Sequence, residues 1–531
     1  MPRSSKDYDL VVIGGGINGA AIARDAALRG LTVLLLEKND FGSGTSSYSS
    51  RLIHGGLRYL EYAEFPLVFE SLRERRRLLL LAPHLVTQLR ISIPVFKQSK
   101  RGMWLVRLGM IAYGLLSLGK IVPRHNMLSR DQVVDALPGL DDRGLIGGAQ
   151  YSDAQVTYAE RLVLENVISA AEAGASVKNY SPLIGINVRN GRLQSVDYID
   201  FASGEETEVT ATVVVNAAGP WVDRVLSTVN REMPGYMGGT KGSHLVVAEF
   251  EGAPADAVYV EAASDGRPFF IIPWNDQVLI GTTDIRYSGD PADATASDAE
   301  IDYLLLETNR LFPKADLHRG AVHFAYAGVR PLPRREIGPE SAITRKHIIK
   351  KHRLLARGLV SIIGGKLTTF RNLAEQTVNY VNKKAGMKGA SCRTRNRRLP
   401  GAKGIAVAAR ELDGIETLSV AGKKRLLGIY GGRATRVASL ARDTPSLAET
   451  LDTDRSIIAA EVAHVIENEY AVSLVDIFYR RMMLGLSSDQ GVQLIEPIAT
   501  VAANSMNWSA RERKSQIDAL HAYNRKFQVG T

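Results

Sequence analysis

The chain has 531 residues, of which 45% are hydrophobic and 23% charged, and its formal net charge is +10. This length exceeds what one hydrophobic core supports, so two or three domains are expected, and the composition excludes a disordered chain. The single cysteine, Cys392, excludes an intramolecular disulfide and a cysteine-based metal cluster. The spacing of His, Asp and Glu residues indicates no metal site.

The first forty residues have the pattern of a nucleotide-binding βαβ unit. An apolar run at Tyr8–Ile13 is followed by a glycine cluster, an alanine-rich segment, a second apolar run at Leu31–Leu36 and an acid. The glycines and the acid are Gly14, Gly16, Gly19 and Glu37. Such glycines permit a sharp turn, the approach of a pyrophosphate and close helix–strand packing, and the acid accepts hydrogen bonds from an adenosine ribose. This context favours a dinucleotide site over an ordinary glycine-rich turn.

Apolar periodicity predicts the elements that follow. A loop of small polar residues at 42–50 precedes a helix at 64–82 and a mixed region at 91–150. Further helices are predicted at Tyr158–Ala173 and Asp298–Leu311, and near Thr368. Strands are predicted at Ser176–Val188, Leu193–Asp200, Thr212–Val215, Ser243–Val247, Ala257–Val260, Phe269–Pro273, Val278–Gly281 and Leu359–Ile363. Residues 381–403 read as a basic linker, and residues 404–525 as predominantly helical.

Nucleotide-binding elements recur at about 10–40, 210–220 and 360–380, which indicates one domain built from separate segments. The predicted fold class is α/β: a Rossmann-like FAD-binding domain, an inserted mixed β-sheet cap domain for the substrate, and an all-helical C-terminal domain. The predicted boundaries are 1–90, 151–235 and 340–385 for the first domain, 91–150 and 236–339 for the cap, and 400–531 for the last. Because glycine-containing strand ends recur so far apart, FAD is preferred over NAD.

One segment has the composition of a helix lying in a membrane interface. No apolar run reaches the ~20 residues of a spanning helix, but Met103–Leu118 is apolar with an aromatic anchor, and basic residues bracket and interrupt it. The apolar members of one face are Trp104, Leu105, Leu108, Ile111 and Leu115, and the basic ones are Arg101, Arg107 and Lys120. A buried core helix explains the same composition. The basic run 393–398 lacks stacking aromatics, so no nucleic acid is expected.

Four sequence strings resemble those of FAD-dependent glycerol-3-phosphate dehydrogenases, the respiratory flavoenzymes, over the whole chain. The strings are 44–47 with 52–60 (GTSS, LIHGGLRYL), 216–221 with 241–244 (NAAGPW, KGSH), 281–284 (GTTD), and 328–332 with 364–369 (GVRPL, GGKLTT). In the C-terminal part, Glu461-Val462, Asp476 and Arg480-Arg481 also fit. Two positions depart from the pattern: Arg51 replaces a frequent lysine and could alter polar contacts near the flavin, and Met482-Met483 replace smaller polar residues.

The resemblance implies a non-covalently bound FAD. Gly14, Gly16, Gly19 and Glu37 hold its ADP half, whereas the remaining implied contacts come from later segments. These are Thr45, Ser46 and Ser50 at the pyrophosphate or ribityl chain, Val177 at the adenine, Ala218 and Gly219 at the second strand end, and Gly365, Lys366, Leu367 and Thr368 at the isoalloxazine. A helix N-terminus and a lysine there favour negative charge on the flavin.

The implied substrate is sn-glycerol 3-phosphate, whose phosphate favours bidentate arginines. Arg58 and Arg330 are the candidates, with Tyr59 as a hydrogen-bond donor; taken alone, either arginine also fits a structural salt bridge. For the base that takes the C2 hydroxyl proton, His244 ranks first and His54 second, although both fit structural histidines too. Lys366 is expected to polarise the C2 oxygen.

The function expected is oxidation of glycerol 3-phosphate to dihydroxyacetone phosphate, with electrons passed to membrane quinone from a monotopic position on the cytoplasmic face. The alternatives are an oxidase that returns electrons to oxygen, an amine or amino-acid oxidase of the same fold, and a flavin-binding membrane scaffold without turnover. Expected partners are the substrate, quinone and the lipid surface, and a homo-oligomer stays open.

Overall fold

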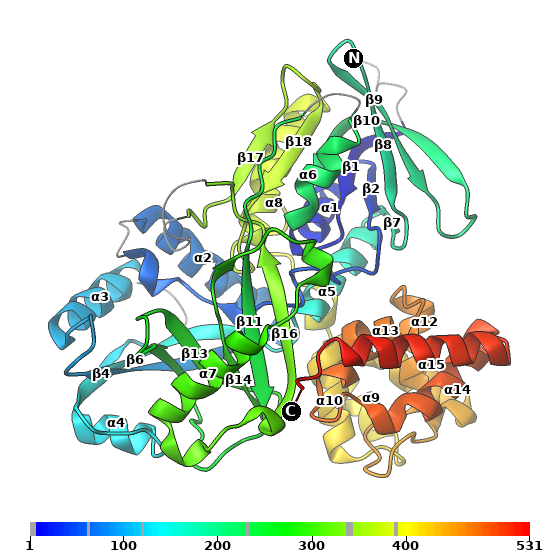
Figure 1. Cartoon of the computed structure of the whole chain (residues 1–531). Coiled ribbons are helices and arrows are strands. Elements are labelled where there is room, and N and C mark those ends of the chain that lie inside the picture. The colour runs from blue at the N-terminus through cyan, green and yellow to red at the C-terminus, as the bar shows by residue number, and fades with distance from the viewer. Residues whose placement is uncertain are drawn as a thin grey trace.

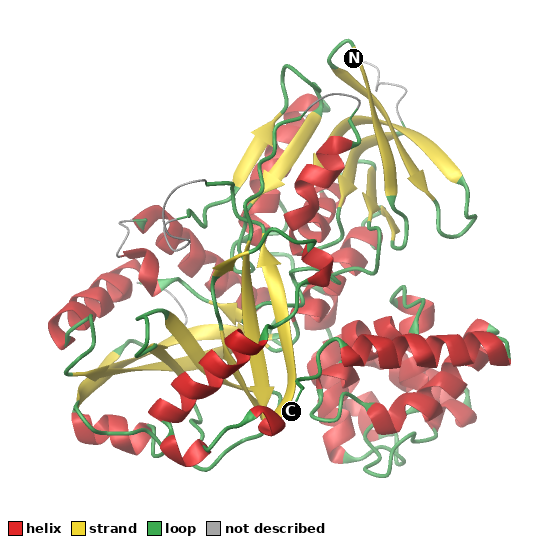
Figure 2. Cartoon of the chain, in the orientation of Figure 1, coloured by secondary structure: helices red, strands yellow, loops and turns green. Residues whose placement is uncertain are grey.

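The structure, a computed structural model, describes residues 7–60, 64–117, 122–229, 233–335, 343–386 and 391–530. It has three parts: a sheet flanked by helices, a second sheet beside it, and a helical region formed by the last quarter of the chain (Figure 1). Figure 2 separates the two strand-rich parts from the C-terminal part, which is helical in the described residues. This architecture confirms the predicted fold class.

The first sheet contains the nucleotide-binding strands. Its order is β17-β18-β10-β1-β2-β7, and β9 and β8 continue from β10 as an antiparallel extension. β1 lies parallel to β2 and β10, and β10 lies parallel to β18. The carboxyl ends of these four strands therefore meet at one edge. The strands are β1 (Tyr8–Ile13), β2 (Val33–Leu36), β7 (Ser176–Lys178), β8 (Leu183–Arg189), β9 (Arg192–Ile199), β10 (Glu206–Asn216), β17 (Ile348–Lys351) and β18 (Leu359–Ile363).

Helix α1 (Ile17–Leu28) is packed closely on this sheet. It lies against α5 (Ala159–Ala171) and α8 (Phe370–Lys384), and its alanine-rich face is buried. A Cβ atom on Gly19 would lie 1.8 Å from the carbonyl oxygen of Gly14, so only glycine permits this approach. The short helix α6 (Val222–Ser227) follows the end of β10.

The second sheet has ten strands in the order β15-β11-β14-β13-β12-β4-β6-β3, with β16 paired to β11 and β5 paired to β6. The strands are β3 (Leu52–Ile53), β4 (Val86–Phe96), β5 (Asn126–Leu128), β6 (Leu145–Val156), β11 (Thr240–Val247), β12 (Ala257–Glu261), β13 (Pro268–Trp274), β14 (Gln277–Gly281), β15 (Ile285–Arg286) and β16 (Val322–Arg330). The helices within these segments are α2 (Phe65–Leu81), α3 (Met103–Leu116), α4 (Arg130–Ala136) and α7 (Asp298–Leu311).

The pairing of these strands shifts two predicted domain boundaries. The boundaries at 90/91 and 150/151 fall inside β4 and β6, which pair along their whole lengths. The short strand β3, predicted to belong to the FAD-binding domain, also pairs with β6. A strand cannot be divided between two sheets without breaking its ladder of hydrogen bonds, so the cap sheet extends further into both flanking segments than predicted.

A further correction concerns Ser176–Val188, which was expected to be a single strand. Residues 176–178 form β7, parallel to β2, whereas β8 begins only at Leu183 and pairs with β9. Between them Tyr180 has a φ of +52° and Pro182 has no N–H to donate, and both features interrupt an extended ladder. The chain thus bends at Asn179–Pro182, next to the strand ends.

The C-terminal part consists of helices connected by short 3₁₀ and π-helical turns. The helices are α9 (Ile405–Asp413), α10 (Val420–Tyr430), α11 (Ala434–Asp443), α12 (Ala459–Asn468), α13 (Leu474–Asp476), α14 (Ile495–Met506) and α15 (Ala510–Arg525). The π-helical turn at Ile477–Arg481 is buried and carries the two arginines noted in the sequence.

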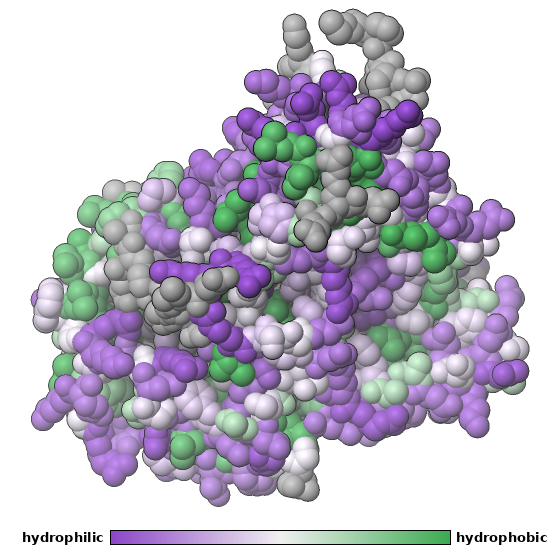
Figure 3. Space-filling model, turned by 45° about the horizontal axis from the view of Figure 1, so that its top comes forward, coloured by the Kyte–Doolittle hydropathy of each residue, from purple (hydrophilic) through white to green (hydrophobic). Residues whose placement is uncertain are grey.

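Helix α3 is exposed along one face, so it is not a core helix. Only Met110 and Tyr113 of this helix are buried, whereas Trp104 is 73% and Leu115 is 62% exposed. Leu105, Leu108 and Ile111 complete the exposed face. Figure 3 shows hydrophobic residues gathered at the left-hand edge, on the side where α3 lies in Figure 1. No helix in the described ranges is long and apolar enough to cross a membrane.

The contact between α1 and β1 predicts a position-specific cost of adding one methyl group. Gly19→Ala should destabilise the protein by about 1–3 kcal/mol, because α1 must move away from the Gly14 carbonyl. Gly109→Ala in α3 is the matched control, since a Cβ atom added there would have no neighbour within 4 Å. The control should be neutral or slightly stabilising, because alanine favours helix. Urea unfolding of both variants measures the difference; equal midpoints would contradict the close-packing argument.

Candidate active site

Two adjoining cavities lie where the parallel sheet meets the cap sheet. One has a volume of about 660 Å³ and the other about 740 Å³. Thr45, Gly365, Lys366 and Leu367 line both, so the two spaces share a wall made by the small-residue loop and by the turn after β18. We call the cavity of about 660 Å³ the strand-end cavity and the cavity of about 740 Å³ the cap cavity.

The strand-end cavity has the form of a dinucleotide site. Gly14 has a φ of +102°, and a Cβ there would lie 2.8 Å from the carbonyl oxygen of Ala217, so the turn requires glycine. The N-terminus of α1 opens into the same space at Gly16, where Ser46 Oγ accepts a hydrogen bond from the Ile17 amide. Amides at a helix N-terminus stabilise phosphate charge.

Glu37 lines the end of this cavity where the sequence predicts the adenosine ribose to bind, and we call this part the ribose end. Its carboxylate accepts hydrogen bonds from the amides of Gly15 (2.6 Å) and Asn39 (2.9 Å), which fix its position. Burial raises the pKa of Glu37, and the two amide donors oppose that shift. The carboxylate oxygens have further lone pairs that can accept hydrogen bonds, for example from a ribose diol.

Most residues predicted to bind the cofactor line these cavities. In the strand-end cavity they are Gly14, Gly16, Glu37, Thr45, Ser46, Ala218, Gly219, Gly365, Lys366 and Leu367. Ser50 and Thr368 line the cap cavity instead. Gly19 lies beneath the site, against Gly14. Val177, predicted at the adenine, pairs with Leu35, packs on the core and lines neither cavity, whereas Tyr180–Leu183 line the strand-end cavity.

His244 lies on β11 in the wall of the cap cavity and is 3% exposed. Its Nε2 atom is 2.8 Å from Ser50 Oγ, its ring stacks on Tyr326, and its Nδ1 atom has no hydrogen-bond partner among the described residues. Burial, then Arg330 and Arg51, lower the pKa of His244 to about 3. The imidazole is therefore neutral at pH 7.

Lys366 and His54 line the same cavity. The Lys366 Nζ atom lies 3.7 Å from the centre of the Tyr59 ring and donates to Ser71 Oγ at 3.3 Å. Burial lowers the pKa of Lys366 to about 7, so both of its protonation states are populated near neutral pH. Burial likewise lowers the pKa of His54 to about 4, and its amide donates to Thr368 Oγ1.

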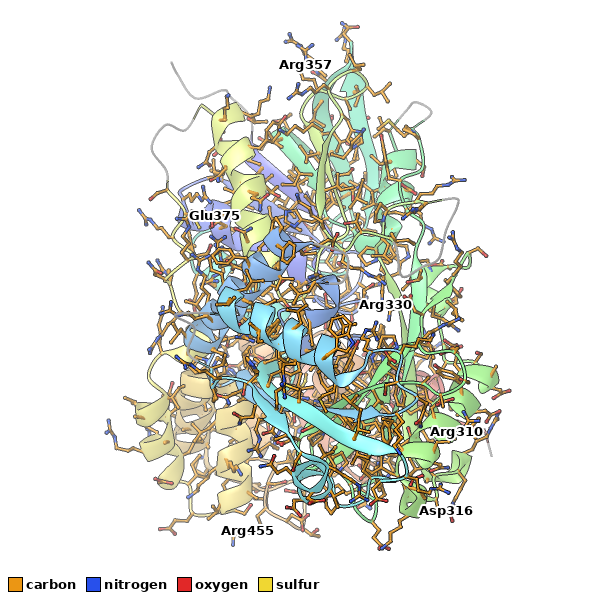
Figure 4. All side chains as sticks on the ribbon, turned by 90° about the vertical axis from the view of Figure 1, so that its left-hand side faces the viewer. Arg310, Asp316, Arg330, Arg357, Glu375 and Arg455 are labelled. Atoms are coloured by element: carbon orange, nitrogen blue, oxygen red, sulfur yellow. The ribbon has the colours of Figure 1, made fainter. Side chains whose placement is uncertain are left out.

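Two arginines converge on one carboxylate at the other end of the cap cavity. Arg330 NH1 and Arg345 NH2 each lie 3.1 Å from an oxygen of Asp284. Burial alone raises the pKa of that carboxyl, but the two guanidinium groups outweigh it and lower the pKa of Asp284. Arg330 lies near the middle of the molecule, whereas Arg310 and Arg455 lie toward its periphery (Figure 4). Together Arg330, Arg345 and Asp284 carry a net positive charge.

Sequence reasoning missed parts of this arrangement. Asp284 was quoted in a motif without a role, and Arg345 was not singled out; no sequence spacing shows that they meet. Arg51, expected near the flavin, forms a bidentate ion pair with the buried Glu160, although it also lines the cap cavity. Tyr59 lines this cavity, but the Arg58 side chain lies outside the described residues.

A glycine-lined dinucleotide cavity joined to a polar cavity with buried basic groups is the arrangement of a flavin-dependent oxidoreductase. Comparison of the sequence with known protein families leads to the same class. The model of the family described as FAD dependent oxidoreductase matches residues 9–371, and that of the C-terminal domain of alpha-glycerophosphate oxidase matches residues 392–513.

Similarity to individual proteins identifies the family more closely. A glycerol-3-phosphate dehydrogenase of Synechocystis is 44% identical, over 97% of this chain and 96% of that protein. A D-erythritol 1-phosphate dehydrogenase of Brucella abortus is 39% identical, over 89% and 93%. The structure of a Bacillus halodurans glycerol-3-phosphate dehydrogenase complexed with FAD superposes with a TM-score of 0.79 at 29% identity, covering 99% and 96% of the two chains. This chain belongs to the FAD-dependent glycerol-3-phosphate dehydrogenase family.

Proposed function

We propose that the protein oxidises sn-glycerol 3-phosphate to dihydroxyacetone phosphate and delivers the electrons to quinone at a membrane surface, with FAD held non-covalently. The observation that carries this proposal is the cap cavity, which combines a neutral buried histidine, a lysine of lowered pKa and a pair of arginines beside the cofactor cavity. FAD supplies the hydride acceptor.

Arg330 and Arg345 are proposed to bind the substrate phosphate. Asp284 holds both guanidinium groups at one end of the cap cavity, and Thr282 Oγ1 accepts from Arg330 as well. Two guanidinium groups fixed in this way lose little side-chain freedom when they bind a dianion, and they attract it by charge. Arg58 remains a further candidate for this role.

His244 is proposed to take the proton of the C2 hydroxyl. A general base must be unprotonated and within reach of its proton, and the lowered pKa of His244 keeps its ring neutral. Ser50 Oγ lies 2.8 Å from Nε2, and Nδ1 is buried without a hydrogen-bond partner among the described residues. Lys366 is proposed to hold its proton toward the C2 oxygen, where a cation stabilises developing negative charge. His54 is the second candidate for the base.

The exposed face of α3 is the proposed membrane contact on the cytoplasmic side. Its five apolar side chains share one side of the helix, which is typical of a helix lying in a lipid interface. Arg107 is exposed and is positioned for lipid phosphates, whereas Arg101 forms an ion pair with Glu261 and is not available as predicted. Lys120 lies outside the described residues.

Anaerobic mixing with glycerol 3-phosphate tests the proposed reaction. Loss of the oxidised flavin absorption is expected, and acid precipitation of the protein should release the flavin. D-erythritol 1-phosphate and glycine serve as comparison substrates, and hydrogen peroxide release in air without quinone tests the oxidase alternative. A flavin spectrum unchanged by glycerol 3-phosphate would refute the proposed function.

Arg330→Ala should lower kcat/KM for glycerol 3-phosphate about 30- to 1,000-fold, chiefly through KM, while the FAD content stays the same. Loss of charged hydrogen bonds to a phosphate costs about 2–4 kcal/mol. Arg90→Ala is the matched control, because Arg90 is exposed and pairs with Asp256 outside the cap cavity. Steady-state kinetics measure the effect; parental KM in the Arg330 variant would remove this residue from the phosphate site.

The pH dependence of flavin reduction separates the roles of Lys366 and His244. If Lys366 acts as a cation, the rate falls as pH rises through its pKa of about 7; a lysine base would instead cause a fall as pH decreases. Lys366→Arg should retain activity and abolish the fall at high pH. His244→Gln should slow flavin reduction by about 10²–10⁴-fold. Rapid-mixing measurements from pH 5.5 to 9 report both, and a larger defect in His54→Gln would reverse the ranking of the histidines.

Replacement of Leu108 and Ile111 by glutamate should release the protein from membranes, because it places two charges on the proposed lipid face. Activity with a soluble acceptor dye should persist, while activity with quinone in vesicles falls. Leu354→Glu with Val420→Glu is the matched control, since these side chains are 90% and 83% exposed outside α3. Vesicle cosedimentation measures binding, and a Leu108/Ile111 variant that still sediments would contradict the assignment.

A further inference from the structure

The end of the C-terminal domain lines the strand-end cavity. Tyr523 and Lys526, at the end of α15, and Arg480, in the π-helical turn, are part of its wall together with the glycine turn and Glu37. These three residues lie far along the chain from Glu37 and from the strand ends of the first sheet. The cavity is therefore incomplete without the C-terminal domain.

The same domain holds the two loops that form the ribose end of this cavity. Arg480 and Arg481 both bind the carboxylate of Asp40, three residues after Glu37. Burial disfavours the charge on Asp40, yet the arginines outweigh it and lower the pKa of Asp40 to about 2. The hydroxyl of Tyr180 donates to Asp476 at 2.6 Å, which fixes the second loop.

A third set of contacts joins α15 and the residues just after it to the small-residue loop, to Ala292 and to β16. The hydroxyl oxygens of Tyr523 and Tyr48 are 3.0 Å apart, and Tyr48 belongs to the small-residue loop. Lys526 Nζ donates to the carbonyl of Ala292, which also lines the cavity. The carbonyl of Phe527 accepts from the amide of Ala325 in β16, the strand that ends at Arg330. The C-terminal domain thus contacts two walls of the cavity, at Tyr48 and Ala292, and the strand β16, whose Val329 also lines the cavity.

We propose that the C-terminal helical domain is a structural part of the FAD site, so that docking of this domain and binding of FAD stabilise each other. The free-energy coupling is reciprocal: a domain that completes the cavity raises FAD affinity, and bound FAD holds the domain in place. The proposal rests on FAD as the cofactor and not on the substrate or acceptor, so its test is independent of turnover.

FAD affinity of the apoprotein tests the first half of the coupling. A variant with Tyr180→Phe, Tyr523→Phe and Lys526→Gln removes three contacts while keeping both rings, and its dissociation constant for FAD, from flavin fluorescence, should rise about 10- to 100-fold. Lys526→Gln alone changes an exposed side chain and should give a smaller rise in a folded protein. Lys514→Gln, on the same helix, and Tyr198→Phe, on β9, are controls that should bind FAD like the parent.

Trypsin cleavage tests the second half. The exposed arginines at 393–398 precede the C-terminal helices, and FAD should slow cleavage there while leaving cleavage at the exposed Arg143 unchanged. In the triple variant, the same FAD concentration should slow trypsin cleavage at 393–398 less than it does in the parent protein. Parental FAD affinity in the triple variant, or a cleavage rate at 393–398 that is the same with and without FAD, would overturn the proposal.

Discussion

The approach of α1 to β1 is the constraint on which the site depends. Because Gly19 lets the helix lie against Gly14, the helix N-terminus points into the space where four parallel strands end. Segments far apart in the sequence, at Glu37, Ala218 and Gly365, reach the same place only because β1, β2, β10 and β18 share this edge. The cap sheet comes from two insertions, β3–β6 between β2 and β7 and β11–β16 between β10 and β17, and the second brings β11 and β16 to the same edge.

Charge in the interior is arranged differently in the two cavities. At the ribose end, the buried carboxylate of Asp40 is neutralised by two arginines. In the cap cavity, two arginines share the single carboxylate of Asp284, and Lys366 is largely buried near an aromatic ring. An unbalanced positive cavity costs folding energy when empty, and this cost is offset when an anion enters.

Local sequence patterns predicted the parts of the structure that depend on near neighbours. The bounds of β1, α7 and β18 agree with the predicted ones, as does the shared exposed face of the five apolar residues of α3. Contacts between distant segments were not predictable: Arg345 meets Asp284 across 61 positions, and Arg481 meets Asp40 across 441. Val177 lines neither cavity, and the bend at Tyr180 has a positive φ that the alternating pattern does not reveal.

The lowered pKa of Lys366 has a thermodynamic consequence for ligand binding. At pH 7 this amine is only partly protonated in the free protein, and a dianion placed in the cap cavity favours the ammonium form. If the proposed substrate binds there, its entry is accompanied by uptake of a fraction of a proton from the buffer, and its affinity weakens as pH rises above 7. The heat of binding therefore depends on the ionisation enthalpy of the buffer, although the reaction leaves the phosphate untouched.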